Sequence, residues 1–159
     1  MGQVLKKFRK CYYIAYPTAV HPPHKINPGV WGEYAKHRNL TYEEVKAHLD
    51  AGEKPVMRFK SNGDPSKYFK VKDAIRGEIS MPENVQDVVI LKKNDLPTYH
   101  FAHVVDDHLM HTTYVVRGEE WMASLPIHVQ LFDAMGWEYP IFCHNTVLMK
   151  IDETTGQNT

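Results

Sequence analysis

Arg117 stands where an expected strand meets an expected helix, a position at which α/β proteins often bind ligands. Residues 112–116 are rich in β-branched side chains and predict a strand, and Glu119 begins an expected helix with acids in its first turn. Ligands of open α/β sheets bind beyond the carboxyl ends of strands, and a helix N-terminus offers free N–H groups to an anion. Arg117 could therefore hold a carboxylate or phosphate through two parallel hydrogen bonds, and Trp121 could stack on a base. The structural alternative pairs Arg117 with Glu119 or Asp107 and places Trp121 in the core.

A group of residues with metal-binding chemistry comes just before this strand. Its members carry the carboxylates and imidazoles that bind metal ions, and they are Asp106, Asp107, His108 and His111. On a helix, Asp107 and His111 would lie four residues apart on one face. No distinct set of further ligands completes the group, so the sequence favours a helix end with partly exposed histidines over a metal site.

The remaining histidines and the cysteines indicate no metal site either. The segment His21-Pro22-Pro23-His24 has no metal-ligand spacing and predicts a loop. Cys11 lacks a Cys-x-Cys partner, so no zinc is expected. The two cysteines, Cys11 and Cys143, do not predict a disulfide framework, and their small number fits a reducing cytoplasm.

The elements around Arg117 predict a parallel βαβ layer. The expected elements are, in order, a helix over residues 100–110, a strand over 112–116, a helix over 125–135 and a strand that begins within 140–143. The apolar spacing of the second helix turns Ile127, Leu131 and Met135 inward, and Gly136 is its expected stop.

The first half of the chain predicts one capped helix followed by short strands. Thr41 and Glu44 form a capping box, and the helix that follows should bury Val45 and Leu49 and end at Gly52. Alternating side chains then predict strands over residues 56–60, 68–72, 74–79 and 87–92, with a turn at 61–65. Pro and Gly residues make residues 1–40 largely irregular, apart from a short basic helix at 4–8.

The composition is that of a globular chain with an uneven charge distribution. Its 159 residues are 43% hydrophobic and 24% charged, and we find neither an export signal nor an apolar run that would span a membrane. The net charge is zero, but residues 1–80 hold 15 basic and 8 acidic residues, whereas residues 81–159 hold 4 and 11. A basic half of this kind indicates either a polyanionic partner or an ordinary solvated surface.

Three stretches of the second half strongly resemble bacterial glutamyl-tRNA synthetases, which are class I aminoacyl-tRNA synthetases. These stretches are Pro-Thr-Tyr-His-Phe-Ala-His-Val-Val-Asp-Asp-His-Leu-Met at 97–110, Val-Arg-Gly-Glu-Glu-Trp at 116–121, and Ser-Leu-Pro-Ile-His at 124–128. Upstream, residues 38–41, 51–52, 56–59 and 73–77 are similar to the family too. The resemblance covers about residues 11–151, and His103 together with residues 149–156 looks most like the clostridial branch.

This resemblance implies an α/β fold with two parts. Residues 1–85 resemble part of the inserted α+β domain that contacts the tRNA acceptor stem in this family, and they are the basic half. Residues 86–151 resemble the C-terminal half of the Rossmann-like catalytic domain, and residues 152–159 form an expected frayed tail.

The resemblance also assigns roles to individual residues. Tyr99, His103 and Arg117 would line the glutamate pocket, with Arg117 holding the side-chain carboxylate. His103 stands where many members of the family have asparagine. Glu120 and Trp121 would lie near ATP and the 3′ adenosine of tRNA.

The implied reaction attaches L-glutamate to tRNA using ATP, as its magnesium complex, through a glutamyl-adenylate. The implied protein is cytoplasmic and monomeric, with no membrane partner. The family's His-x-Gly-His and Lys-Leu-Ser-Lys-Arg signatures are absent from the sequence, so we expect no glutamate activation by this chain alone. The alternatives are an inactive tRNA-binding module and a metal-dependent enzyme. Glutaminyl-tRNA synthetases resemble the chain less around Arg117.

Overall fold

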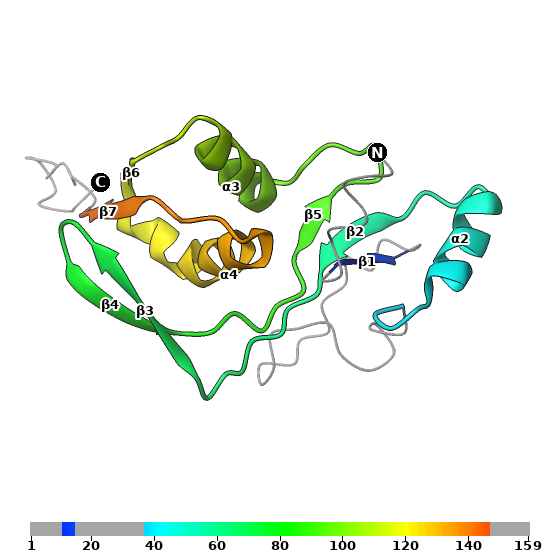
Figure 1. Cartoon of the computed structure of the whole chain (residues 1–159), viewed down its shortest axis with the longest axis horizontal. Helices are drawn as coiled ribbons and strands as arrows, with labels where there is room; N and C mark the ends of the chain where they lie inside the picture. Colours follow the sequence, from blue (N-terminus) through cyan, green and yellow to red (C-terminus); the bar gives the residue numbers. More distant parts are fainter. Residues whose placement is uncertain (1–10, 15–36, 147–159) are drawn as a thin grey trace, which may run out of the picture.

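The computed structural model describes the backbone of residues 11–14 and the whole of residues 37–146. The described elements are, in chain order, β1 (Cys11–Ile14), α2 (Tyr42–Asp50), β2 (Val56–Phe59), β3 (Tyr68–Asp73), β4 (Gly77–Pro82), β5 (Val89–Leu91), α3 (Tyr99–Leu109), β6 (Tyr114–Gly118), a 3-10 helix (Glu119–Ser124), α4 (Leu125–Met135) and β7 (Ile141–Asn145). In Figure 1, α4 lies between α3 and the strands β3 and β4.

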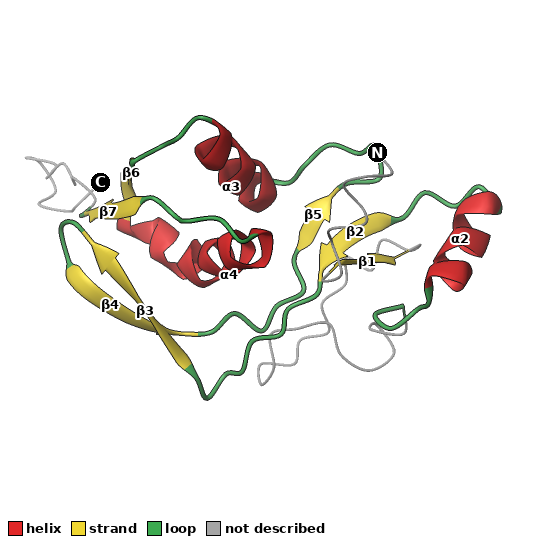
Figure 2. Ribbon diagram, viewed as in Figure 1, coloured by secondary structure: helices red, strands yellow, loops and turns green. Residues whose placement is uncertain are grey.

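The sheet that carries Arg117 has the strand order β4-β3-β7-β6 (Figure 2). Strands β6 and β7 are parallel, with Tyr114 opposite Ile141 and Arg117 opposite His144, and α4 connects them. This confirms the expected parallel βαβ layer, because parallel neighbours need a long crossover. Strand β3 meets β7 in parallel at Asp73, and β4 pairs with β3 as an antiparallel hairpin.

A second, antiparallel sheet has the order β1-β2-β5. The connectors β2–β3 and β4–β5 run between the two sheets, so each sheet takes strands from both sides of residue 85. The fold is therefore a mixed α/β arrangement in which parallel and antiparallel pairings coexist.

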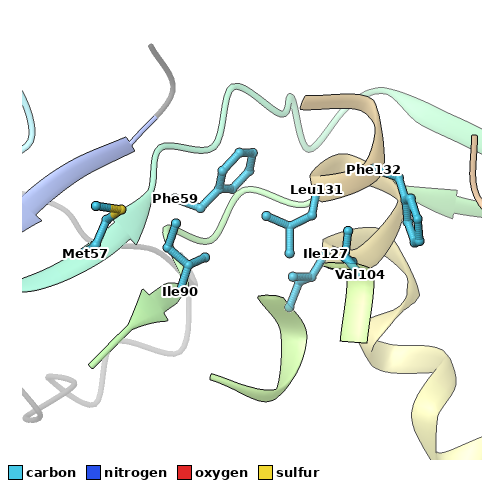
Figure 3. Packing of buried hydrophobic residues seen from close by; sticks show 7 residues of the cluster. All are labelled: Met57, Phe59, Ile90, Val104, Ile127, Leu131 and Phe132. Atoms are coloured by element: carbon cyan, nitrogen blue, oxygen red, sulfur yellow. The ribbon is translucent and has the colours of Figure 1, made fainter. Parts of the chain in front are cut away.

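Helix α4 separates two apolar clusters. On one side, Leu125 and Val129 pack with Val71 and Phe142 of the four-stranded sheet. On the other, the buried residues of the larger cluster come from β2, β5, α3 and α4, and Figure 3 shows them: Met57, Phe59, Ile90, Val104, Ile127, Leu131 and Phe132. The expected inward positions Ile127 and Leu131 are buried, while Met135 is half-buried. Gly136 has φ 70°, a left-handed conformation that suits glycine at a helix end.

The two connectors between the sheets are tied by a set of hydrogen bonds that we call the connector junction (Arg38, Ser61, Asn84, Asp87 and Gln130). Arg38 Nε lies 2.6 Å from Asp87 Oδ2, and Arg38 Nη2 donates to the Ser61 carbonyl at 2.6 Å. The Ser61 N–H donates to Asp87 Oδ1 at 2.8 Å. Asn84 Nδ2 donates to Gln130 Oε1 at 2.8 Å, which attaches the junction to α4. Asp87 is 3% exposed, so its charge is balanced directly by a guanidinium.

The capping box of α2 is confirmed, but its expected buried side is wrong. Thr41 and Glu44 satisfy each other's backbone N–H groups, and Gly52 follows the helix with φ 81°. No residue of α2 is buried, Val45 is half-buried, and Leu49 is 43% exposed. The spacing of apolar residues therefore predicted the helix correctly, but no face of α2 is buried in the described structure.

Other differences from expectation concern element boundaries. The strand expected at 74–79 begins three residues later, because Ala74–Arg76 form the turn of the β3–β4 hairpin. The strand expected at 112–116 lies at Tyr114–Gly118, so Arg117 is inside it, and the helix from Glu119 begins as a 3-10 turn. The expectations for residues 4–8, 21–24 and 152–159 lie outside the described residues. Among the described helices, none has the length and apolar character to cross a membrane.

Candidate functional site

Arg117 is the centre of five hydrogen-bonded side chains that we call the arginine–histidine line (Asp73, His144, Arg117, His128 and His100). Arg117 Nε donates to His144 Nε2 at 3.0 Å, and Nη1 lies 3.1 Å from His128 Nδ1. His144 Nδ1 lies 2.6 Å from Asp73 Oδ2, and His100 Nδ1 lies 2.9 Å from His128 Nε2. Three strand ends and two helices supply these residues.

The line fixes the protonation of two imidazoles. Arginine carries only hydrogen-bond donors, so the ring nitrogens that face it must be acceptors. His144 therefore carries its proton on Nδ1 and donates it to Asp73, and His128 carries its proton on Nε2 and donates it to His100. Both histidines have no exposed surface and are neutral in this arrangement.

Asp73 is held as an acceptor at the end of β3. Its Oδ1 accepts the N–H groups of Ile75 and Arg76 at 2.9 Å each, and its Oδ2 accepts the N–H of His144 at 3.1 Å. Burial raises the pKa of Asp73, but hydrogen bonds from Arg76, the His144 ring and Ile75 outweigh it, so the pKa lies below its usual value. The residue is therefore a buried carboxylate.

One end of the Arg117 guanidinium makes no hydrogen bond of good geometry in the described region, although the Tyr99 side chain is close enough to favour its charge. Nη2 is buried and makes no hydrogen bond, and no carboxylate among the described residues forms an ion pair with Arg117. Burial lowers the pKa of Arg117, while Tyr99, Asp107 and Asp73 oppose that shift. Arginine stays protonated under all ordinary conditions, so the site holds an oriented cation with free donor capacity.

Aromatic rings from α3 and the 3-10 helix surround this cation. The Tyr99 ring lies 4.8 Å from that of Trp121 and stacks in parallel with His103 at 5.8 Å. The His103 ring lies 4.5 Å from that of His128. Tyr99 is 49% exposed and Trp121 36%, so both form the outer rim rather than the core.

His103 and Asp107 form a second polar pair one helical turn apart on α3. His103 Nδ1 lies 3.0 Å from Asp107 Oδ2, although the groups are not aligned for a hydrogen bond. His103 Nε2 is buried and has no partner in the described region. Together with Arg117 Nη2, it is an unsatisfied polar atom at this end of the sheet, and such buried atoms are rare unless a ligand or water completes them.

The neighbouring histidines are less basic than usual. Burial lowers the pKa of His128 to about 2, with further lowering from His103, Arg117 and the other rings. Burial also lowers the pKa values of His100 and His103, although Asp107 opposes the shift at His103. The His100, His103 and His128 rings therefore add no positive charge at neutral pH.

The structure brings together four of the five residues expected at the site. Tyr99, His103, Arg117 and Trp121 lie in one cluster, but Glu120 is exposed and its carboxylate lies against Gly118. The alternative pairing of Arg117 with Glu119 or Asp107 does not occur: Glu119 pairs with Arg76, and Asp107 lies 3.0 Å from His103.

Sequence reasoning missed His144, His128, His100 and Asp73. His144 is opposite Arg117 in the parallel register, so the expected neighbouring strand could have indicated it. Asp73 and His128 gave no comparable signal, because they reach Arg117 only through folding.

The described residues at this site form no cluster of metal ligands. No group of three or more possible ligands occurs among the residues that the structure describes, and His108 stacks on Trp137 at 3.9 Å instead of joining its acidic neighbours. A cavity of about 200 Å³ lies elsewhere, between α4 and the connectors, beside Asn84, Gln130 and Asp133. Its described lining contains no lysine, arginine or histidine, so this cavity offers no cation to an anionic ligand.

The chain matches a family model over residues 30–155, described as "tRNA synthetases class I (E and Q), catalytic domain". It is 59% identical over 127 residues to a glutamate–tRNA ligase of Acetivibrio thermocellus, and 56% identical over 128 residues to one of Clostridium beijerinckii. Each match covers 80% of this chain and 23% of the relative, so the chain spans about a quarter of these proteins.

The comparison with solved structures also finds a glutamate tRNA ligase. The chain is similar to the crystal structure of a glutamate tRNA ligase from Elizabethkingia meningosepticum in complex with its amino acid, with a TM-score of 0.70 and 29% identity. The match covers 99% of this chain and 38% of that one. The similarity therefore includes the sheet ends and helices that position Arg117.

Proposed function

Because the chain belongs to the class I tRNA synthetase family (E and Q), within its catalytic domain, we propose that the Arg117 site binds L-glutamate. The chain supplies one side of the amino-acid pocket of a glutamate–tRNA ligase, the enzyme that joins L-glutamate to tRNA with ATP through a glutamyl-adenylate. Arg117 binds the side-chain carboxylate in this proposal.

The observation that carries the proposal is the buried Nη2 of Arg117 without a partner. A buried cation is costly unless an anion compensates it, and no protein carboxylate in the described region forms an ion pair with Arg117, although Asp107 and Asp73 favour its charge from a distance. A carboxylate fits the outer edge of a guanidinium through two parallel hydrogen bonds. The carboxylate of glutamate meets this requirement, whereas the neutral amide of glutamine does not.

The aromatic rim supports the same assignment. Tyr99 and Trp121 provide an apolar wall beside Arg117, which suits the methylene groups of glutamate, and His103 offers a buried ring nitrogen as a further polar contact. Trp121 and the exposed Glu120 stand on the solvent side, where ATP and the 3′ end of tRNA would approach in the proposed reaction.

The proposed reaction needs groups beyond this chain. Attack of a carboxylate on the α-phosphate of ATP, bound as its magnesium complex, develops charge that cationic and donor groups must stabilise. The described region offers Arg117 for the amino acid but lacks both family signatures, so this chain binds without activating. The full-length enzyme would be a cytoplasmic monomer.

The charge distribution favours a second role for the first part of the chain. Residues 1–85, proposed as part of the acceptor-stem domain, include the basic half, and residues 86–151, proposed as the C-terminal half of the Rossmann-like catalytic domain, include the acidic half. Since strands from both parts share each sheet, this division is one of function rather than of separate folds. An inactive tRNA-binding module is the alternative for the chain as a whole, and a steep loss of tRNA affinity with rising salt would support it.

Calorimetry with the purified chain tests the proposal. We expect L-glutamate to bind measurably, L-glutamine to bind at least tenfold more weakly, and Arg117→Met to abolish glutamate binding while the far-UV spectrum is unchanged. Equal affinity for glutamate and glutamine would contradict the proposal, because it would remove the role of the carboxylate. A Glu78→Ala variant, which changes an exposed carboxylate on β4, is the matched control and should bind like the wild type.

A further inference from the structure

We propose that His144 and Asp73 are positioning residues, which hold Arg117 as an oriented cation without neutralising its charge. The proposal deepens the assignment of the glutamate site and rests on it for the identity of the ligand. Its structural content, the protonation and orientation of three side chains, can be measured without any ligand.

The first step is the anchoring of Asp73. Three backbone N–H groups, from Ile75, Arg76 and His144, fix both carboxylate oxygens, so the side chain cannot rotate away. A carboxylate only accepts hydrogen bonds, so His144 must present Nδ1–H to it across 2.6 Å. The turn after β3 therefore determines which nitrogen of His144 carries the proton.

The protonation of His144 in turn fixes the orientation of Arg117. With its proton on Nδ1, His144 has a lone pair on Nε2, and that lone pair accepts Arg117 Nε–H at 3.0 Å. His128 holds Nη1 in the same way at 3.1 Å. The guanidinium plane is thus fixed on two sides by neutral rings, and its remaining hydrogens, two on Nη2 and one on Nη1, form the edge that a carboxylate can use.

The His144 ring also keeps the charges of Asp73 and Arg117 apart. The imidazole of His144 separates Asp73 from Arg117, so the anion orients the cation through a ring instead of pairing with it. A carboxylate in direct contact would occupy the donors that the ligand needs, as Asp87 does for Arg38 at 2.6 Å. An aspartate–histidine–arginine order gives orientation and leaves the attraction for an incoming carboxylate in place.

Nitrogen-15 NMR of the histidine rings in the ligand-free chain tests the protonation directly. We expect His144 as the neutral Nδ1–H form and His128 as the neutral Nε2–H form at pH 7. A charged His144, or a proton on its Nε2, would overturn the proposal, because neither form can accept a hydrogen bond from Arg117. This result is independent of whether glutamate binds.

Two substitutions at His144 each keep one of its two hydrogen bonds and remove the other. His144→Asn places an amide near Nδ1 and keeps the donor to Asp73, whereas His144→Gln places one near Nε2 and keeps an acceptor for Arg117. We expect a slowly exchanging Arg117 Nε–H signal in the wild type and in His144→Gln, and rapid exchange in His144→Asn. We also expect glutamate affinity to fall by about tenfold or more in His144→Asn and less in His144→Gln.

The outcomes separate the two proposals. Equal glutamate affinity of wild type and His144→Asn would show that His144 does not position Arg117. Failure of glutamate to bind the wild type, with the expected ring protonation and Nε–H exchange observed, would refute the glutamate site and leave the positioning intact. If both substitutions unfold the chain, the ring protonation of the wild type still decides.

Discussion

Arg38 and Arg117 both reach into polar interior regions, but the protein holds them in opposite ways. In the connector junction, Arg38 meets the buried Asp87 directly and also donates to the Ser61 carbonyl. In the arginine–histidine line, Arg117 donates hydrogen bonds to ring nitrogens of His144 and His128, its guanidinium lies over the Phe142 ring, and Nη2 makes no hydrogen bond of good geometry within the described region. The first arrangement compensates a charge to join two connectors, and the second orients a charge that an outside anion can compensate. A direct carboxylate partner is thus what distinguishes the structural Arg38 from Arg117, for which we propose a binding role.

The largest expected effect is loss of stability on breaking the junction. Asp87→Ala would leave Arg38 without its carboxylate and the Ser61 N–H without an acceptor, and we expect about 3 kcal/mol of destabilisation, since Arg38 is partly solvated. Urea unfolding measures this. Glu78→Ala, which removes an exposed partner of Lys70, is the control and should cost below about 1 kcal/mol. Similar costs for the two variants would show that the junction is not structural.

The next effect concerns binding rather than stability. Arg117→Lys keeps a positive charge but cannot reach His144, His128 and a ligand at once, so glutamate affinity should fall by about 10- to 100-fold, or about 1.4–2.8 kcal/mol. Calorimetry measures the change. Arg38→Lys is the matched control, and among folded molecules it should leave glutamate affinity unchanged. A loss of affinity in both variants would remove the distinction between the two arginines.

Part of the pH dependence of stability should come from His128 in the arginine–histidine line. His128 is fully buried with its pKa lowered to about 2, so below its usual value of 6.5 the unfolded chain binds a proton that the folded chain does not. The free energy of unfolding should therefore decrease as the pH is lowered, and His128 should account for about 1.4 kcal/mol of this decrease between pH 7.5 and 5.5. The stability that Asp73 provides is lost only at lower pH, below its ordinary value of 3.8.

Urea unfolding at the two pH values measures this difference, and the comparison with His128→Gln isolates it. The variant should lose the part of the slope that His128 contributes, whereas His100 and His103, whose pKa values burial also lowers, keep theirs. An unchanged slope in the variant would place the titration elsewhere in the molecule.

The smallest expected effect is at the edge of the junction. Gln130→Ala removes one of the two acceptors of Asn84 Nδ2 and a donor to Ser61 Oγ, and we expect a loss of about 1 kcal/mol with no change in glutamate affinity. Gln86→Ala, at an exposed neighbouring position, should stay within about 0.5 kcal/mol of the wild type. A drop in glutamate affinity for Gln130→Ala would show that the two polar regions are coupled through α4.

Sequence reasoning predicted the features that local chemistry determines. The Thr41 and Glu44 capping box, the bounds of α4 and the position of Arg117 at the end of a strand depend on residues close together in the chain. The partners of Arg117 do not, because Asp73 and His144 are 71 residues apart and meet only when β3 joins β7. Leu49 shows an error of the opposite kind. The helical spacing of apolar residues predicted that it is buried, but no other described element packs over it and it is exposed.

Helix α4 has a further consequence for how the molecule opens. It contributes to both apolar clusters, and it carries His128 and Gln130 on opposite faces, one in each polar region. Neither sheet can move away from α4 without exposing one apolar side of this helix to water. Partial unfolding that detaches either sheet is therefore costly in free energy. Amide hydrogen exchange should therefore show β3, β7 and α4 exchanging together at the global rate, whereas α2, with no buried residue, exchanges through small local fluctuations. The described region would then unfold as one cooperative unit with a loosely attached helix at its edge.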